Sequence, residues 1–172
     1  MRLVIASDLH GSAYYANKLI DAFNQLKADK LLLLGDILYH GPRNDLPRDY
    51  NPKAVFELLN KYADRIICVK GNCDSEVDQM VLEFPIISEH STVFADGIAL
   101  HMTHGHKYNP QNPLPAKKGD VVLFGHIHLV VDEVVGGVRY INPGSISIPK
   151  DDNGHGYMLF ENGNFSRFVI ND

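Results

Sequence analysis

The chain has 172 residues, of which 45% are hydrophobic and 22% charged, and it carries a formal net charge of −5. Its length suits a single domain over residues 1–172, because a typical domain has roughly 100–200 residues. The ordinary composition excludes a disordered or collagen-like chain, and the acidic balance provides no basic field for a long nucleic-acid duplex.

The first predicted element is a short apolar strand over residues 2–6. Asp8 interrupts the apolar run that begins there, so the run is too short for a signal sequence or a membrane span. The two cysteines, Cys68 and Cys73, lack the partners that a disulfide framework or a zinc quartet would need. We therefore expect a cytoplasmic protein that has no membrane partner.

Strands and helices then alternate along the first half of the chain. Ser12 is a candidate N-cap for a helix whose apolar residues recur at three-to-four spacing, and a buried strand follows over 31–34. A second amphipathic helix follows Pro52, and a third apolar run covers 66–69. Continuous apolar strands between helices predict a parallel sheet that is covered on both faces.

The loop over 40–53 is rich in proline and charge. It is long enough to act as a lid over a site, although a plain surface loop fits the sequence equally well.

After about residue 85 the pattern changes to strands separated by turns. Residues 91–95 and 98–103 predict a hairpin around an Asp96-Gly97 turn, and 121–124 form a further buried strand. Two more turns are expected at Gly136-Gly137 and Asn162-Gly163. The second half therefore predicts a mostly β sheet that faces the first, giving an α/β fold with a two-sheet β-sandwich flanked by helices.

Nearly every predicted strand ends in a side chain that can bind a metal ion. These side chains are Asp8 and His10, then Asp36, Asn72, His104 with His106, and finally His126 with His128. Each has an ordinary interpretation alone, as a turn, cap or loop residue. Because ligands in open α/β sheets bind outside the carboxyl ends of the strands, we expect the whole set to converge.

The donor types narrow the choice of metal. Carboxylate, amide and imidazole donors without thiolate suit manganese, iron, zinc, cobalt or nickel. A carboxylate can bridge two ions, and Asp36 is the natural bridge because it follows the middle one of the first three ligand-bearing strands.

Five motifs, Asp8-x-His10, Gly35-Asp36, Gly71-Asn72, His104-Gly105-His106 and Gly125-His126-x-His128, resemble the signature of the calcineurin-like metallophosphoesterase superfamily. The loops at 71–74, 40–44 and 142–145 are similar to those of the YfcE-type bacterial phosphodiesterases. The resemblance covers the whole chain. It implies a four-layer α-β-β-α fold and a phosphoric ester hydrolase that cleaves phosphodiester bonds.

The resemblance also implies a dinuclear metal site, for which manganese is the first expectation. Asp8, His10, Asp36 and His128 would hold one ion, and Asp36, Asn72, His104 and His126 would hold the other. A hydroxide that bridges the ions would attack phosphorus, and the ions would stabilise the departing oxygen. The candidate catalytic residues are Asp36, Asn72, Cys73, Asp74 and His106.

Cys73 departs from the pattern, because many superfamily members have histidine after the Gly-Asn pair, where it can protonate the leaving group. A thiol is a poor substitute, which favours substrates whose leaving group needs little protonation. A space-filling role under the loop is the alternative for Cys73. We expect His106 to face the substrate or support the site in preference to binding metal.

Two other functions are compatible with this fold. A retromer scaffold subunit shares it without a full ligand set, whereas every ligand position is filled here. Zinc nucleases of the superfamily add a DNA-binding surface or a capping domain, for which this acidic chain has no room. We therefore expect a small phosphodiester substrate, and a homo-oligomeric assembly is left open.

Overall fold

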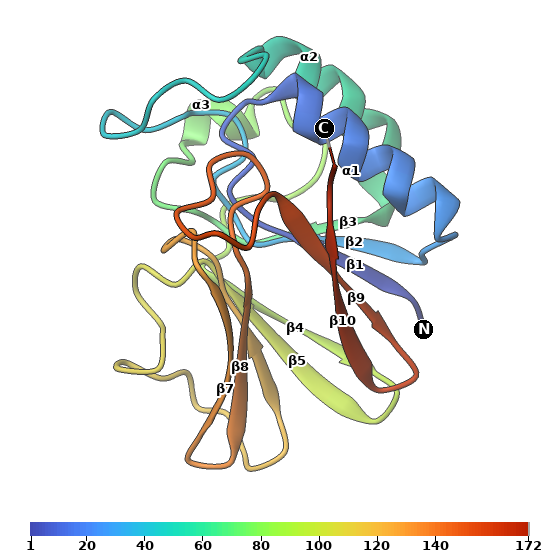
Figure 1. The fold of residues 1–172 in the computed structure, drawn as a ribbon, viewed down its shortest axis with the longest axis vertical. Helices are drawn as coiled ribbons and strands as arrows, with labels where there is room; N and C mark the ends of the chain where they lie inside the picture. Colours follow the sequence, from blue (N-terminus) through green and yellow to red (C-terminus); the bar gives the residue numbers. More distant parts are fainter. Residues whose placement is uncertain (172) are drawn as a thin grey trace.

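A computed structural model describes residues 1–171 and contains two five-stranded sheets. In Figure 1 the helices α1 (Ala13–Gln25) and α2 (Pro52–Leu59) lie over one side of the molecule, next to the strands β1 (Leu3–Ala6), β2 (Lys30–Leu33) and β3 (Ile66–Cys68). The short helix α3 (Glu76–Gln79) lies on the same side. The predicted two-sheet sandwich with flanking helices is confirmed. Within residues 1–171, no helix combines the length and the apolar character that a membrane crossing requires.

The first sheet has the strand order β10-β9-β1-β2-β3. The strands β1 (Leu3–Ala6), β2 (Lys30–Leu33) and β3 (Ile66–Cys68) are parallel, as the alternation of apolar runs and helices predicts. The N-cap prediction is confirmed, because the Ser12 hydroxyl accepts a hydrogen bond from the Tyr15 amide at 3.3 Å. These three strands therefore present their carboxyl ends at one edge of the sheet.

The second helix is shorter than its apolar pattern suggests. α2 begins at Pro52 and ends at Leu59, and a 3₁₀ helix continues from Asn60 to Arg65. Tyr62 leaves helical geometry with a φ of −122°, so the apolar spacing continues through a change of helix type.

The hairpin of β9 (Gly156–Glu161) and β10 (Asn164–Val169) pairs antiparallel with β1 and belongs to the first sheet. The prediction of a purely parallel first sheet, with all later strands in the facing sheet, is wrong in this respect. β9 is buried along nearly its whole length, so it needs cover on both faces. Its place beside β1 provides that cover between the helices and the second sheet.

The second sheet has the order β4-β5-β6-β8-β7. β4 (His90–Ala95) and β5 (Ile98–Thr103) form the predicted hairpin, whose turn residues Asp96 and Gly97 both have positive φ, as the favoured two-residue turn requires. The remaining strands are β6 (Val121–Leu123), β7 (Val130–Val135) and β8 (Val138–Pro143). β6 is parallel to both β5 and β8.

Apolar side chains pack on both sides of each sheet. One cluster joins the two sheets and includes Ile5, Leu100 and Leu123, all fully buried. On the outer face of the second sheet Ala116 packs against a cluster that contains Phe124. The segment between β5 and β6 covers this face without a helix. Burial on both faces fixes the strands, and the strand ends are thereby held in place.

Candidate metal centre

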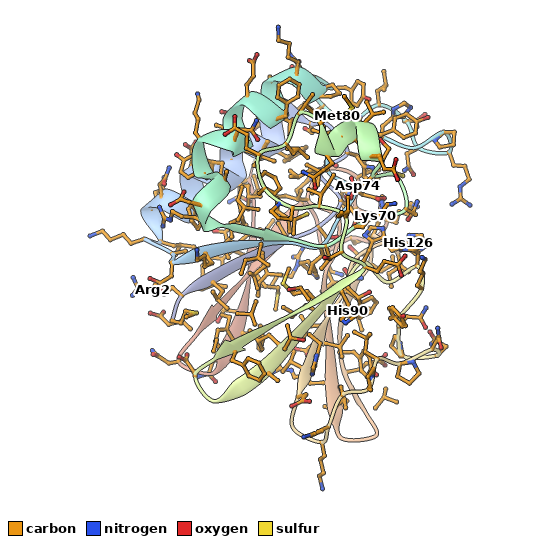
Figure 2. All side chains as sticks on the ribbon, turned by 180° about the vertical axis from the view of Figure 1, so that it is seen from behind. Arg2, Lys70, Asp74, Met80, His90 and His126 are labelled. Atoms are coloured by element: carbon orange, nitrogen blue, oxygen red, sulfur yellow. The ribbon has the colours of Figure 1, made fainter. Side chains whose placement is uncertain are left out.

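The loops that follow the strands gather at one edge of the molecule, where Figure 2 shows Lys70, Asp74 and His126 in the same region. Five of the predicted metal-binding residues adopt a left-handed backbone, with positive φ at Asp8, His10, Asp36, His126 and His128. Such a conformation strains a residue with a side chain, and this strain is concentrated at functional sites. The packing around these loops therefore holds the five side chains in conformations that an unsupported chain would avoid.

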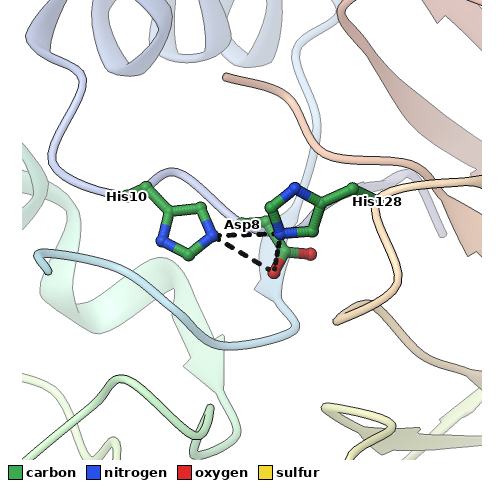
Figure 3. A group of neighbouring side chains, drawn as sticks. All are labelled: Asp8, His10 and His128. Carbon is green, nitrogen blue, oxygen red and sulfur yellow. Dashed lines mark hydrogen bonds and ion pairs between the residues drawn. The ribbon is translucent and has the colours of Figure 1, made fainter. Parts of the chain in front are cut away.

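Asp8, His10 and His128 form the first cluster, in which the side chains point toward one another (Figure 3). The Nε2 atoms of the two histidines are 3.1 Å apart, and they lie 3.6 Å and 3.3 Å from Asp8 Oδ1. All three residues are buried. Asp8 Oδ2 accepts a hydrogen bond from the His126 amide, whereas the buried Oδ1 has no hydrogen-bond partner.

The outer nitrogens of three histidines are held by backbone carbonyls. Nδ1 of His10, His104 and His128 lies 2.8 Å, 2.7 Å and 2.7 Å from a carbonyl oxygen. A carbonyl only accepts hydrogen bonds, so each Nδ1 carries a proton, and the lone pair of each Nε2 is left to bind a second proton or a cation. These lone pairs face one another and face carboxylates, an arrangement that requires protons or a cation between them.

Asp36 connects this first cluster to a second one. Its Oδ2 atom lies 3.4 Å from His104 Nε2 and 3.8 Å from His10 Nε2, and Asp8, Asp36 and His104 form a further group of converging ligand atoms. The amide oxygen of Asn72 is 3.0 Å from His104 Nε2. One carboxylate oxygen therefore faces a histidine of each predicted metal site.

A cavity of about 400 Å³ opens onto these side chains. It is lined by His10, Asp36, Gly41, Pro42, Arg43, Asn44, Asn72, Cys73, His126, Ile127, His128 and Lys150. His126 is half-buried on its wall and lies beside His104, although it joins none of the converging groups found among residues 1–171. The Cys73 thiol converges with His10 and Asp36.

The 40–53 loop fits either a lid or a plain surface loop in the sequence, and hydrogen bonds anchor one part of it in the structure. Backbone hydrogen bonds tie Asp49 to Ala13 and Asn51 to Gly11, and the Ser12 hydroxyl donates to a carbonyl of the same loop. Residues 41–44 instead form a wall of the cavity. The anchored part of the 40–53 loop is therefore at its carboxyl end.

Asp74 lies beneath the site and does not face the cavity. Its carboxylate accepts hydrogen bonds from the amides of Asp36, Ile37 and Gly71 at 2.8 Å, 2.8 Å and 2.7 Å. Burial raises the pKa of Asp74 to about 6, against the opposing effect of the Ile37 amide. Three amides hold the Asp74 carboxylate in place, which fits a residue that positions the loops, and the catalytic role that we expected for it stays a prediction.

His106 lies at the rim of the site, with its ring centre 5.4 Å from that of His104 and 6.0 Å from that of His126. It is half-buried, and its Nδ1 is buried without a hydrogen-bond partner. Burial, followed by the charge of His104, lowers its pKa. The expectation that His106 supports the site or faces substrate stays a prediction.

Further hydrogen bonds hold the backbone of the metal-site loops, and they come from residues outside the predicted catalytic and metal-binding set. The hydroxyls of Ser145 and Ser147 both donate to the Asp8 carbonyl, at 2.9 Å and 2.7 Å, and Asn142 donates to the Gly125 carbonyl. Lys150 lines the cavity as well. In the sequence only the family resemblance points to the 142–145 turn, because hydroxyls that bind backbone leave no periodic pattern.

Two glycines allow the loops to approach closely. A Cβ on Gly71 would lie 2.0 Å from Asp36 Oδ1, and a Cβ on Gly125 would lie 1.8 Å from the Ser7 hydroxyl. Any larger residue would displace the Asp36 or Asp8 loop. In the Gly-Asn and Gly-His pairs the glycine therefore lets two loops approach closely, and the residue after it provides the side chain at the site.

The carboxylates and histidines shift one another's protonation. Burial alone would lower the pKa of His104, but the Asp36 carboxylate and the charge of Asp8 raise it to about 9. Burial would likewise raise the pKa of Asp8, but the rings of His10 and His128 hold it well below its ordinary value. Without metal, protons on the histidines therefore balance the carboxylates, and a divalent cation would take their place.

This exchange predicts that metal binding weakens in acid. The metal-free protein holds a proton on His104 below about pH 9, and loading must release it, so apparent affinity should fall by up to tenfold for each pH unit below that value. Isothermal titration with manganese at pH 6, 7 and 8, in buffers of different ionisation enthalpy, would count the released protons. An affinity that is constant from pH 6 to 8 would contradict the exchange.

Comparisons with known proteins agree with this geometry. Residues 1–164 match the calcineurin-like phosphoesterase superfamily domain. The chain is 45% identical over 172 residues to phosphodiesterase YfcE of Escherichia coli (strain K12), which covers 100% of this chain and 94% of that protein. The solved structure of YfcE, a phosphoesterase from E. coli, matches with a TM-score of 0.92 at 42% identity, covering 99% of this chain and 100% of that one.

A more distant structure shares only the fold. Vps29 from Entamoeba histolytica, complexed with Zn²⁺, matches with a TM-score of 0.60 at 18% identity and covers 99% of this chain and 98% of that chain.

Proposed function

The chain belongs to the calcineurin-like phosphoesterase superfamily, and from this membership we propose that it hydrolyses phosphodiester bonds of small substrates with two divalent ions. It is an enzyme of the phosphoric ester hydrolase class. One observation carries the dinuclear proposal: Asp36 Oδ2 faces His10 on one side and His104 on the other, and the inner nitrogens of both rings are available to a cation. Two ions would therefore share this carboxylate.

The proposed metal ligands form two sets, one on each side of Asp36. Asp8, His10 and His128 would hold one ion, and Asn72, His104 and His126 would hold the other. The orphaned Asp8 Oδ1 fits the first ion, because a buried carboxylate oxygen without a donor needs positive charge nearby. When bound, divalent ions supply a hydroxide nucleophile near neutral pH and neutralise charge on the phosphoryl oxygens.

Manganese is the metal that we propose first. The proposed ligand set contains carboxylate, amide and imidazole donors and no thiolate, which suits manganese better than metals that select thiolate.

We predict that diesters are better substrates than monoesters. A diester carries one negative charge, whereas a monoester carries nearly two at neutral pH, and the only cationic side chains that line the cavity within residues 1–171 are Arg43 and Lys150. Both are exposed, so solvent weakens their attraction for the extra charge. Steady-state kinetics on matched 4-nitrophenyl esters would decide this, and a clearly higher kcat/KM for the monoester would disprove it.

Metal reconstitution separates the enzyme from a non-catalytic scaffold. The protein would be stripped with a chelator and reloaded in turn with manganese, zinc, cobalt and nickel, and assayed on bis(4-nitrophenyl) phosphate. We expect activity to disappear on chelation and to return with manganese at a stoichiometry of two ions per chain. Binding of metal without any ester hydrolysis would favour the scaffold.

A further inference from the structure

We propose that a second cavity beside the candidate metal centre binds one ester arm of the substrate and accepts an uncharged or cationic group of about phenyl size. This inference rests on the proposed function. The cavity has a volume of about 210 Å³, and its walls come from the 105–111 loop, the end of β6 and the exposed strand β7. None of the predicted catalytic or metal-binding residues except His106 and His126 line it.

The two cavities adjoin, because His126 and Ile127 line both of them. The first cavity is also lined by Asp36 and Cys73, and the second by Phe124 and Val131. A group attached to phosphorus at the metal centre would therefore need only to extend past His126 to enter the second cavity. This adjacency is our reason for assigning the occupant to the substrate.

The volume of the second cavity fits a substituent and is smaller than that of pockets that enclose a whole ligand. Pockets that enclose complete small molecules measure roughly 300–1,000 Å³, whereas an apolar cavity of about 150 Å³ is sufficient for benzene. At about 210 Å³ the space corresponds to one phenyl-sized arm.

The walls determine which chemistry that arm has. Phe124, which is 3% exposed, forms an apolar surface together with Val131 and Pro110. Glu133 adds a carboxylate at the exposed side. The main cavity has Arg43 and Lys150 instead. An anionic arm is therefore disfavoured in the second cavity, and an uncharged or cationic arm is favoured.

The wall opposite β7 is ordered by its own hydrogen bonds. The Asn109 side chain donates to the Gly105 carbonyl at 3.0 Å and accepts from the amides of Gln111 and Asn112, each at 3.0 Å. Pro110 within this turn restricts the backbone further. The cavity is thus preformed, and an arm that enters it would meet little cost of ordering the loop.

The test uses phosphodiesters in which one arm is methyl and the other arm is varied. Such a diester can bind in either orientation. The arms would be methyl, benzyl, 2-trimethylammonioethyl and 2-carboxyethyl, and the readouts would be the inhibition constant against bis(4-nitrophenyl) phosphate and calorimetric binding to the manganese-loaded protein. We expect benzyl and trimethylammonioethyl to bind about tenfold more tightly than methyl, and carboxyethyl to gain nothing.

Two variants locate the effect. Val131→Phe should fill the cavity and remove the benzyl gain of about tenfold while leaving dimethyl phosphate unchanged. Glu133→Gln, which does not alter packing, should improve carboxyethyl binding by about fivefold and leave benzyl binding unchanged. Asp132→Asn is the matched control for charge, because Asp132 pairs with Arg139 and lies outside the cavity. Val134→Phe controls for an added aromatic ring on the exposed part of the same strand.

The outcomes separate the subsite from the function. The subsite would be overturned if the loaded protein binds dimethyl phosphate and hydrolyses diesters, but neither Val131→Phe nor Glu133→Gln changes its preference among the arms. The proposed function would then still stand. Loaded protein that neither binds dimethyl phosphate nor hydrolyses any diester would overturn both. Selective effects of the two variants, absent from their controls, would support the assignment.

Discussion

Replacing Asp36 by alanine is expected to lower kcat/KM by at least about 10³-fold and to release both metal ions. The reason is the position of one oxygen. Asp36 Oδ2 faces His10 and His104, which belong to different proposed ions, and Oδ1 accepts the Cys73 amide at 2.8 Å. Loss of the carboxylate would thus remove the proposed ligand of both ions and would also loosen the loop that presents Asn72.

The comparison that tests bridging is with single histidine variants. His10→Ala and His104→Ala should each weaken one ion, so metal analysis should find close to one ion per chain, against none for Asp36→Ala. Asp49→Ala is the matched control, because Asp49 also has a positive φ but is exposed and outside the cavity. Retention of both ions and substantial activity in Asp36→Ala would show that this carboxylate does not bridge.

The convergence of the site could be predicted because it follows from local patterns and one topological rule. Apolar runs end at Asp8, Asp36, Asn72, His104 and His126, and parallel strands bring their carboxyl ends to one edge. The structure places these side chains around one cavity or directly beside it, in agreement with that rule. Their roles as metal ligands remain a prediction.

What could not be predicted depends on contacts between distant parts of the chain. β9 reads as an ordinary buried strand, and nothing local indicates that it pairs with β1, more than 150 residues earlier. Asp74 follows Asn72 and Cys73 like another site residue, and only the fold shows the amides of Asp36 and Ile37 against its oxygens. The left-handed backbone at the ligand positions is likewise imposed by packing, since aspartate and histidine do not require it.

Replacing Cys73 by histidine is expected to extend the enzyme to poorer leaving groups. An alkoxide that departs from phosphorus needs a proton or metal contact, whereas a nitrophenolate does not, and a positioned general acid is typically worth about 10²–10⁴ in rate. The Cys73 thiol is half-buried on the cavity wall beside Gly41 and accepts a hydrogen bond from Asn72 at 3.3 Å. With a pKa raised by burial, and then by Asp36, to about 12, it donates a proton poorly at neutral pH.

An imidazole at position 73 would face the same cavity, because Cys73 lines it. The Asp74 carboxylate next to it already accepts hydrogen bonds from the amides of Asp36, Ile37 and Gly71. Wild type, Cys73→His and the non-titrating control Cys73→Ser would be compared on phosphodiesters of graded leaving-group pKa. We expect a gain that grows with leaving-group pKa in the histidine variant alone, reaching about 10²-fold for alkyl leaving groups. Parallel plots for all three proteins would show that position 73 does not contact the departing oxygen.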